Sequence, residues 1–391
     1  MKVFIKGLNS CPMRRQNLHQ YRAYIRAVGR TIVEDPSIAD TIILWSCAFR
    51  GDVRDNSLSE IKRYKRDFKA RIIIAGCLPD IDPELLKNAF DGEIIPWRDD
   101  SERLQEIFGT DYNPDVFREV FAESNLCDDT AEYRRQNPES DATFHDQFLK
   151  LLVSEGCRFN CSYCSEKLAF PPYRSYPADD LVKACRRMVE QTSKREVILI
   201  ADSLGDYGCD IGTNLPSLIQ NLTTNLPGVK FALGNLNPAS FLGFFEEMEE
   251  LLRNGHIRHL NLPIQSASNR LLTLMKRTYT KAEIGKIFGM LNSIGFTEFD
   301  THLIIGFPSE SDTDFEETMS FILHHRPKYV LASSYMESPR MNSAEIPDKV
   351  PVDVMRTRIR TFEERMQRAA ILYNTDDSEL SIDRLRRLNR V

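Results

Sequence analysis

Three cysteines within one short segment constrain this chain more than any other feature. Cys157, Cys161 and Cys164 form a Cys-x3-Cys-x2-Cys pattern that follows the apolar run 148–153. Thiols with this spacing on a tight loop can converge on one centre, and they leave a fourth position free. A structural zinc site is normally closed by four ligands, and the next cysteine, Cys185, falls inside a predicted helix. Thiolates hold iron–sulfur clusters, and a four-iron cluster with three protein ligands leaves one iron free, so such a cluster stands beside a structural metal knuckle and unrelated core cysteines as a candidate.

The length and composition of the chain indicate a globular protein of more than one domain. It has 391 residues, of which 42% are hydrophobic and 28% are charged, and this composition supports sizeable cores. The net charge of −6 does not favour a general nucleic-acid binder. The N-terminus lacks the apolar core of a signal peptide, and no apolar run approaches the length of a membrane span. We therefore expect a cytoplasmic protein with no membrane partner, where grouped thiols are metal or catalytic sites rather than disulfides.

The first part of the chain, residues 1–110, alternates short apolar strands with amphipathic helices. Strands are expected at 3–5, 42–45 and 71–75, and helices at about 14–28 and 53–68. Uniformly apolar strands that alternate with helices are typical of a parallel sheet covered on both faces. This pattern predicts a flavodoxin-like or Rossmann-like α/β domain.

Three further cysteines each follow one strand of that predicted sheet. Cys11 comes after the first strand, Cys47 after the second and Cys77 after the third. Ligand sites in parallel α/β sheets lie beyond the carboxyl ends of the strands, so these thiols can meet at one edge. The alternative is three separate buried thiols, because free cysteine is often a core residue. We favour a second cluster site, since each cysteine lies in loop sequence beside Gly, Pro or Ser.

The remainder of the chain predicts a second α/β domain. Residues 111–146 are polar and acidic and are expected to connect the domains. From residue 147 to 340, six strands with intervening helices indicate a partial (β/α)6 barrel of the TIM type. Residues 341–391 are expected to form a C-terminal helical segment, with one charged helix over about 352–372 and a polar tail. The six expected strands are 148–153, 197–201, 230–233, 259–262, 301–306 and 329–331.

The cysteine patterns and two longer blocks resemble one known family. Cys-x3-Cys-x2-Cys with Tyr163 before its last cysteine is similar to the signature of the radical SAM superfamily. Gly7-Leu-Asn-Ser-Cys11, Leu44-Trp-Ser-Cys47 and Ile74-Ala-Gly-Cys77 resemble the N-terminal cysteine blocks of the radical SAM methylthiotransferases. Residues 261–280 resemble that family's LPxQSGS…LxxMxRxYT block, and residues 301–318 resemble its DxIxGFPGE…DFEET block. The similarity reaches from residue 1 to about residue 360.

The resemblance implies two [4Fe-4S] clusters and S-adenosylmethionine (SAM) as cofactors. Cys157, Cys161 and Cys164 would hold the cluster whose open iron binds SAM, and Cys11, Cys47 and Cys77 would hold an auxiliary cluster that delivers sulfur. Tyr163 would lie against the adenine of SAM. The other residues implied as cofactor contacts follow the barrel strands, where an ordinary loop role is the alternative for each: Asp202 and Ser203 for the methionyl ammonium, Asn235 and Asn237 for ribose or carboxylate, Gln265 at the barrel mouth, and Gly306 for close approach to the adenine.

Four departures from the family pattern bear on the substrate. Ala201-Asp202-Ser203 stands where the family usually has Gly-Gln-(Asn/Asp), and the QSGS motif is Gln-Ser-Ala-Ser at 265–268. The basic segment after the cysteine loop is here 171–176, Pro-Pro-Tyr-Arg-Ser-Tyr. No strand-rich stretch remains after residue 340 for the TRAM domain with which tRNA and ribosomal-protein methylthiotransferases grip their macromolecules. The acidic balance also speaks against an RNA substrate, because RNA binding rests on basic patches.

The function implied is insertion of sulfur or methylthio at an unactivated C–H bond by a radical SAM methylthiotransferase. We expect a peptide, such as a ribosomally made peptide natural product, or a small molecule as substrate, and a flavodoxin or ferredoxin as electron donor. One alternative is a tRNA adenosine methylthiotransferase without a TRAM domain. A second is an oxidation or rearrangement enzyme whose auxiliary cluster transfers electrons. The third is a non-catalytic iron–sulfur binding protein.

Overall fold

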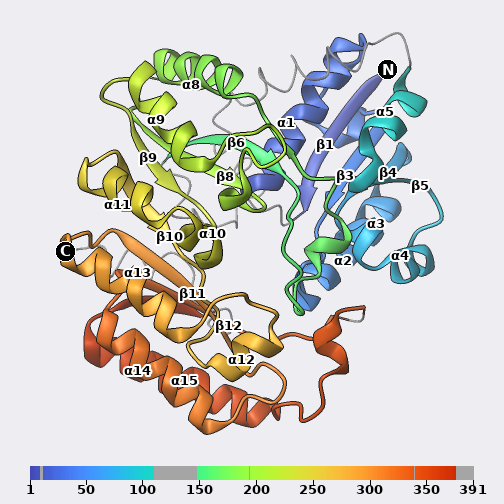
Figure 1. Cartoon of the computed structure of the whole chain (residues 1–391). Helices are drawn as coiled ribbons and strands as arrows, with labels where there is room; N and C mark the ends of the chain where they lie inside the picture. The colour runs from blue at the N-terminus through green and yellow to red at the C-terminus, as the bar shows by residue number, and fades with distance from the viewer. Residues whose placement is uncertain (9–11, 110–147, 193, 339, 376–391) are drawn as a thin grey trace. The chain divides into compact units, whose positions relative to one another are not determined.

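The computed structural model of the protein describes residues 1–8, 12–109, 148–192, 194–338 and 340–375, which belong to two compact units (Figure 1). The first unit is drawn from residues 1–140, 149–157 and 164–194. The second is drawn from residues 141–148, 158–163 and 195–391. The division therefore passes through the Cys157 segment rather than falling at residue 147, where the sequence pattern places the start of the second domain.

A parallel five-stranded sheet forms the centre of the first unit. The strands run in the order β2-β1-β3-β4-β5, and Ile5 pairs with Ile43, which in turn pairs with Ile73. This is the flavodoxin-like order, so the expected fold class of the N-terminal domain is confirmed. The strands of this sheet and the helices between them are β1 (Lys2–Leu8), α1 (Pro12–Ala27), β2 (Thr31–Ile32), β3 (Thr41–Ser46), α2 (Gly51–Asp67), β4 (Arg71–Gly76), α3 (Leu78–Ile81), α4 (Pro83–Ala89), β5 (Glu93–Pro96) and α5 (Asp100–Phe108).

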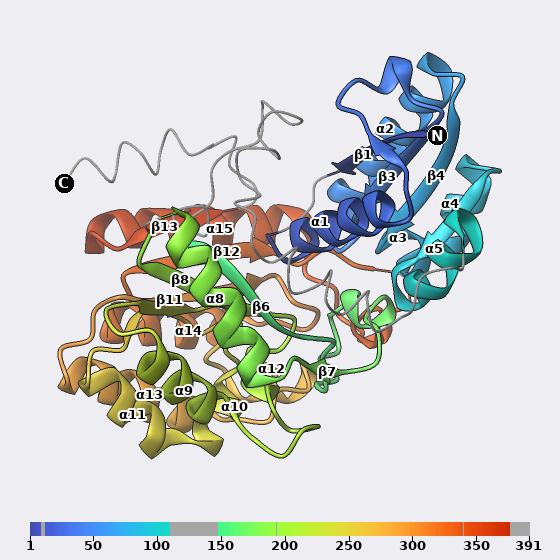
Figure 2. The same cartoon turned by 90° about the horizontal axis from the view of Figure 1, so that it is seen from above.

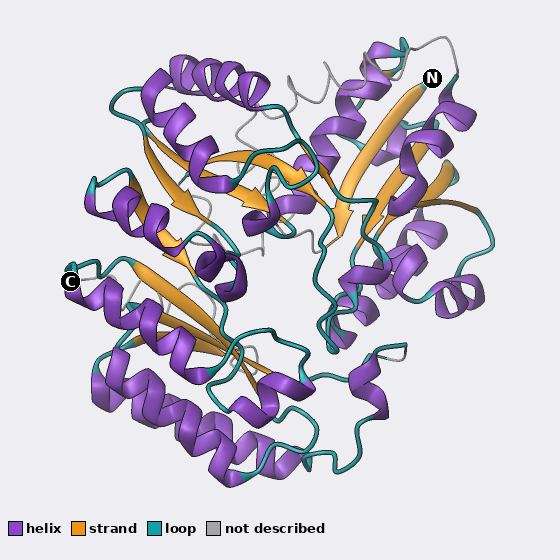
Figure 3. Cartoon of the chain, in the orientation of Figure 1, coloured by secondary structure: helices purple, strands orange, loops and turns teal. Residues whose placement is uncertain are grey.

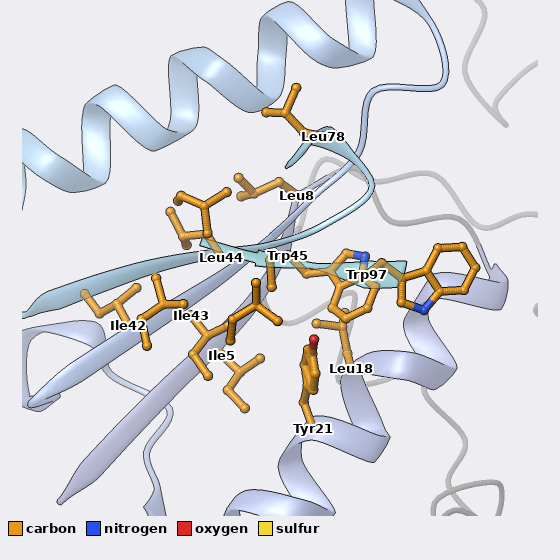
Figure 4. Packing of buried hydrophobic residues seen from close by; sticks show 14 of the residues in the cluster. Ile5, Leu8, Leu18, Tyr21, Ile42, Ile43, Leu44, Trp45, Leu78 and Trp97 are labelled. Carbon is orange, nitrogen blue, oxygen red and sulfur yellow. The ribbon is translucent and has the colours of Figure 1, made fainter. Parts of the chain in front are cut away.

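The apolar character of the strands explains why both faces of this sheet are covered. All six residues of β3 are buried, as expected for an interior parallel strand with helices on either side. Figure 4 shows Leu18 and Tyr21 of α1 directed toward Trp45 of β3 and Trp97, which follows β5. The Tyr21 and Trp45 ring centroids are 4.9 Å apart. Helix α1 is thus packed against the strands by aromatic contacts close to their carboxyl ends.

The first unit also contains the chain on either side of the cysteine loop. Strand β6 (Leu149–Glu155) is entirely buried and pairs in antiparallel fashion with β7 (Arg174–Ser175), and α8 (Ala178–Thr192) follows. Asn17 of α1 donates to the buried Glu155 carboxylate over 3.1 Å, and Tyr176 donates to the same carboxylate over 2.9 Å. These hydrogen bonds tie α1 to the strand that leads into the cysteine loop.

The second unit is a series of parallel strands and helices. Its described strands lie in the order β8-β9-β10-β11-β12-β13 and pair in parallel throughout, and Figure 3 shows the alternation of strands and helices by colour. Helices α13, α14 and α15 pack side by side outside the strands (Figures 1 and 2). The main elements are β8 (Glu196–Ala201), α9 (Leu215–Asn225), β9 (Lys230–Leu233), α10 (Pro238–Gly243), α11 (Phe245–Arg253), β10 (Ile257–Asn261), α12 (Asn269–Leu274), α13 (Lys281–Ser293), β11 (Phe299–Ile305), α14 (Asp312–His325), β12 (Tyr329–Ser334), α15 (Val352–Ala369) and β13 (Leu372–Thr375).

The C-terminal segment differs from the expectation of helix alone. Helix α15 ends at Ala369, and residues 372–375 form β13, which pairs in parallel with β12 from Tyr329↔Leu372 to Ala332↔Thr375. Ala370 adopts a left-handed conformation (φ 55°) that ends the helix and turns the chain back toward the sheet. The strand series therefore extends beyond residue 340. None of the helices that the structure describes is both long enough and apolar enough to cross a membrane.

Candidate functional site

Cys47 and Cys77 lie side by side at the carboxyl edge of the first unit's sheet. They follow β3 and β4 directly, and each is about 1% exposed. A hydrogen bond from Cys77 lowers the pKa of Cys47, while that same bond and burial raise the pKa of Cys77 well above its usual value. A pair of thiols in this contact favours one thiolate, and thiolate is the form that binds metal. Cys11, the third expected ligand, lies outside the described residues.

The position of this pair follows a general rule of open parallel sheets. Ligands bind beyond the carboxyl ends of strands at the point where strand order reverses, which in the order 2-1-3-4-5 is the gap between β1 and β3. Cys47 follows β3, and Cys11 follows β1 in the sequence. The switch point of the sheet therefore lies next to the end of β3, which Cys47 follows directly.

The chain that follows Cys164 packs on the same edge of the first unit. Ser165 donates its hydroxyl to the backbone carbonyl of Phe49 over 3.0 Å, and Phe49 is two residues beyond Cys47. Arg98 donates to the Leu168 carbonyl over 2.9 Å, and the Trp97 ring makes an edge contact with Phe170, with centroids 5.9 Å apart. The end of the Cys157–Cys164 loop is thereby anchored next to the loop that carries Cys47.

The loop from Cys157 to Cys164 offers three thiols in different degrees of burial. Cys161 is buried, whereas Cys157 and Cys164 are half-buried. No three His, Cys, Asp or Glu side chains within the described ranges are grouped so as to hold a metal ion. The donor type and spacing nevertheless fit a cluster with three thiolate ligands, since thiolates are the ligands of four-iron clusters.

Arg277 is a residue of this site that sequence reasoning did not single out. Its Nη1 donates to Cys161 Sγ over 3.4 Å, its Nη2 to the Pro263 carbonyl over 2.7 Å, and its Nε to the Tyr279 hydroxyl over 2.7 Å. Burial lowers its pKa, but the charges of Tyr163, Tyr279 and Cys161 outweigh burial and raise the pKa well above the usual value. Arg277 therefore presents a permanent positive charge to the Cys161 sulfur.

Tyr163 packs on an apolar cluster of the second unit. Its ring makes an edge contact with Phe307, with centroids 6.5 Å apart, and Phe307 in turn contacts Tyr335 at 5.4 Å. The neighbouring residue Ser162 donates its hydroxyl to Leu274 O over 2.8 Å and its N–H to Met275 O over 3.0 Å. The middle of the cysteine loop is held by this cluster and these hydrogen bonds.

The residues expected after strands β8 and β9 do follow those strands, but two of them have local structural roles. The hydroxyl of Ser203 donates to Asp206 Oδ2 over 2.8 Å, and that oxygen also accepts the Arg158 N–H over 3.4 Å. The buried Asn237 accepts from the Ala239 N–H over 3.0 Å and caps the N-terminus of α10. Ser203 and Asn237 thus shape the strand-end loops, and their contact with SAM stays a prediction.

Asp202 and Asn235 also lie at strand ends. Asp202 is half-buried directly after β8. Asn235 has a left-handed backbone (φ 54°), and its N–H donates to Asn261 Oδ1 over 3.1 Å. Both residues lie beyond the carboxyl ends of neighbouring strands, as the sequence pattern predicts.

Gln265 and Gly306 are defined by backbone geometry. Gln265 has a φ of 67° and forms a bridge with Leu303, in which its N–H donates to the His302 carbonyl over 2.8 Å. Gly306 has a φ of 79°, and its N–H donates to Glu310 over 2.8 Å. A Cβ atom at Gly306 would lie 2.7 Å from the side chain of Met355. The space beside Gly306 is thus occupied by a side chain of α15, and the approach of Gly306 to adenine stays a prediction.

A buried polar network on β10 and β11 was also not predicted. His259 and Asp300 are 3.0 Å apart, Asn261 donates to the other oxygen of Asp300, and Asn261 is 3.1 Å from His302. Burial raises the pKa of Asp300, but the hydrogen bond and charge of His259 outweigh it and the pKa is lowered. The signal in the sequence is the alternation His-x-Asn in β10 and Asp-x-His in β11, which places all four side chains on one face.

Comparisons with family models agree with this arrangement. The model of the radical SAM superfamily matches residues 151–322, and the model described as "Uncharacterized protein family UPF0004" matches residues 2–95. Similar curated proteins are named methylthiotransferases. The chain belongs to the radical SAM methylthiotransferase family. Members of this family are transferases that use SAM and two [4Fe-4S] clusters, so the expected family and cofactors are confirmed.

Methylthiotransferases of two substrate classes are among the relatives. A probable threonylcarbamoyladenosine tRNA methylthiotransferase of Pyrococcus horikoshii is 27% identical over 87% of this chain and 78% of its own length. The human threonylcarbamoyladenosine tRNA methylthiotransferase is 28% identical over 85% of this chain, which spans only 57% of that protein. Ribosomal protein uS12 methylthiotransferase RimO of Geotalea uraniireducens is 28% identical over 95% of this chain and 83% of its length. These names do not support the natural-product peptide or small molecule that the sequence led us to expect as substrate. They also do not support the expectation that tRNA ranks below those substrates.

Solved structures confirm the fold class of this chain. The radical SAM methyltransferase TsrM from Kitasatospora setae superposes with a TM-score of 0.61 at 11% identity, over 85% of this chain and 74% of TsrM. The radical enzyme OxsB superposes with a TM-score of 0.58 at 13% identity, over 92% of this chain and 56% of OxsB. At these identities the likeness concerns the fold alone.

Proposed function

We propose that this chain replaces a C–H hydrogen by a methylthio group on an adenosine of tRNA, with SAM and two [4Fe-4S] clusters as cofactors. The observation that carries the two-centre reaction is the hydrogen bond from Ser165 to Phe49. It joins the segment after Cys164 to the segment after Cys47 within one compact unit, so the end of the cysteine loop lies beside a loop of the second group of cysteines. The choice of tRNA is supported by the names of similar proteins from archaea and animals.

Cys157, Cys161 and Cys164 are the ligands we assign to the SAM-binding cluster, and Cys11, Cys47 and Cys77 are those we assign to the auxiliary cluster. When bound, these cofactors supply radical hydrogen abstraction and a sulfur atom for transfer, chemistry that no side chain can perform. The protein's share is to bind, orient and exclude water. The electron donor in this proposal is a low-potential protein such as a flavodoxin or ferredoxin. A reducing compartment such as the cytoplasm keeps the cysteines as thiols that remain available to bind a cluster.

The residues around the first group of thiols have definable tasks in this proposal. Arg277 holds Cys161 in place by donating to its sulfur over 3.4 Å. Asp202 and Asn235 stand beyond the carboxyl ends of β8 and β9, and we assign them the role of accepting hydrogen bonds from SAM. Tyr163 is held on Phe307 by ring contact, which restricts the orientation of its ring.

A ribosomal protein is the second candidate substrate. It is favoured by the similarity to the uS12 methylthiotransferase RimO, which extends over 95% of this chain. A side chain of a ribosomal protein and a base of tRNA both present an unactivated C–H bond, so the two candidates require the same chemistry from the cofactors. They differ in the macromolecule that must be held.

Direct product analysis tests the proposal. The protein is reconstituted with iron and sulfide without oxygen and is incubated with dithionite, SAM and either total tRNA or recombinant ribosomal protein uS12, and the nucleosides or peptides are analysed by mass spectrometry. We expect an adenosine derivative that has gained CH3S in place of H, together with 5′-deoxyadenosine and S-adenosylhomocysteine. A methylthio group found only on uS12 would establish the second candidate. SAM cleavage without sulfur in any product would contradict sulfur transfer and favour an electron-transfer role for the auxiliary centre.

A further inference from the structure

Asn261, the last residue of β10, holds the loop that follows β9. Its side-chain oxygen Oδ1 accepts the N–H of Asn235 over 3.1 Å, and its backbone carbonyl accepts the N–H of Leu236 over 3.0 Å. The side chain of Asn261 is buried, so its amide is shielded from water. Two consecutive N–H groups of the loop are therefore fixed by a single residue of the neighbouring strand.

The orientation of the Asn261 amide follows from its partners. A backbone N–H can only donate, so the atom that faces Asn235 must be the amide oxygen, and Nδ2 then takes the other position. Nδ2 donates to Asp300 Oδ1 and lies 3.1 Å from Nε2 of His302. An amide nitrogen has no acceptor site, so Nε2 of His302 accepts this hydrogen bond. The oxygen and both hydrogens of the Asn261 amide are thus engaged.

Asp300 anchors this amide from the next strand. Asn261 is paired with Asp300 in the register of β10 and β11, so the two side chains share one face of the strands. The second carboxylate oxygen, Oδ2, lies 3.0 Å from Nε2 of His259, and Asp300 is buried. A buried carboxylate with a partner on each oxygen has little freedom to turn. A chain of hydrogen bonds therefore runs from His259 through Asp300 and Asn261 to the backbone of Asn235.

The backbone of Asn235 depends on such support. Its φ of 54° lies in the left-handed region, which residues with a Cβ adopt only where the surrounding structure holds them. We propose that Asn261 is a positioning residue for SAM binding, because it fixes the loop that presents Asn235, and that Asp300 in turn fixes Asn261. This inference rests on the proposed function, which assigns Asn235 a contact with SAM. It adds two residues that act on SAM through Asn235.

The affinity of the reconstituted protein for SAM tests this inference. Wild type and variants are loaded with iron and sulfide without oxygen, their iron is counted, and the dissociation constant of SAM is measured by calorimetry without a reductant, so that SAM is not cleaved. Asn261→Ala removes the acceptor of the Asn235 N–H. We expect this change to weaken SAM binding about tenfold, as the loss of one buried hydrogen bond does, and to leave the iron content as in the wild type.

Two variants that keep the size of the side chains separate hydrogen bonding from packing. Asn261→Asp retains an oxygen for the Asn235 N–H but sets a second carboxylate against Asp300, so it should also weaken SAM binding about tenfold. Asn261→Asp/Asp300→Asn exchanges the two groups and restores a donor and an acceptor with the same net charge. It should regain most of the affinity, since His302 can meet the exchanged carboxylate by carrying its proton on Nε2.

Phe299→Leu is the matched control for lost stability. Phe299 directly precedes Asp300 on β11, but its side chain lies on the opposite face and contacts the Phe288 ring of α13, with centroids 5.1 Å apart. This change should lower the urea midpoint of unfolding without changing the dissociation constant of SAM.

The outcomes distinguish this inference from the proposed function. Unchanged SAM affinity in Asn261→Ala with its full iron would overturn the positioning role, and so would an equal loss of affinity in Phe299→Leu. Equal losses in Asn261→Asp and in the exchanged double variant would overturn it as well, because packing would then be the cause. If Asn261→Ala fails to fold, the two variants of unchanged size still decide. If the wild type with its full iron binds no SAM, it is the proposed function that fails.

Discussion

Replacement of Gly306 by alanine tests how the loop after β11 is built. The backbone at Gly306 has a φ of 79°, a conformation that costs a residue with a Cβ about 1–2 kcal/mol. The added Cβ would lie 2.7 Å from both Cγ and Sδ of Met355 in α15. Overpacking of this kind costs about 1–3 kcal/mol, toward the low end here because a methionine side chain is flexible. We expect Gly306→Ala to lower the free energy of unfolding by about 2–4 kcal/mol.

A control and a double variant separate the two contributions. Gly295 has a similar φ of 70°, and nothing lies within 4 Å of the position that a Cβ would occupy, so Gly295→Ala should cost only the backbone share of about 1–2 kcal/mol. Unfolding in urea is followed by circular dichroism for each protein without cofactors. The Gly306→Ala/Met355→Ala protein should lose less stability than the sum of the single changes. If Gly306→Ala is no more destabilising than Gly295→Ala, the close contact with Met355 does not constrain this loop.

Two further predictions concern buried charges. Burial is the main cause that raises the pKa of Glu310 to about 7, despite its 2.8 Å ion pair with Arg358. Between about pH 4.5 and 7 the folded protein therefore keeps a proton on Glu310 that the unfolded chain has released. The free energy of unfolding should therefore fall by at most about 3 kcal/mol as pH rises from about 4.5 to 7. Glu310→Gln should remove this fall, which is checked by urea midpoints measured at pH 5 and pH 8. An unchanged pH profile in the variant would contradict the role of Glu310. Arg277→Met should lower the iron retained by the Cys157–Cys164 loop and slow 5′-deoxyadenosine formation at least tenfold, whereas an unaltered iron count and rate would show that the contact with Cys161 is incidental.

The sequence predicted the strands and their ends well because parallel interior strands have a strong signal. Residues 41–46 and 71–76 are almost continuously apolar, and the expected ranges 42–45 and 71–75 differ from the observed strands by one residue at most at each end. Each cysteine and polar candidate that the structure describes after a strand lies where that strand's end predicts. The placement of the residues therefore followed from periodicity alone.

The roles of the candidate site residues could not be predicted from the sequence pattern, because these roles depend on contacts between residues that are distant in the sequence. Asn237 caps a helix, which a loop asparagine before proline can do as readily as bind a cofactor. Arg277 contacts a cysteine 116 residues away, and only the fold brings them together. Strand β13 is four residues long and closely follows a charged helix, so its pattern is too short to separate it from the end of that helix.

The most direct test of the account is the iron content of two proteins reconstituted in parallel without oxygen. We predict about eight irons in the wild type and about four in Cys157→Ala/Cys161→Ala/Cys164→Ala, as two four-iron clusters require, with 5′-deoxyadenosine formed from SAM and dithionite only by the wild type. About four irons in the wild type and none in the variant would contradict the account, because the thiols at Cys11, Cys47 and Cys77 would then hold no cluster from which sulfur could be transferred.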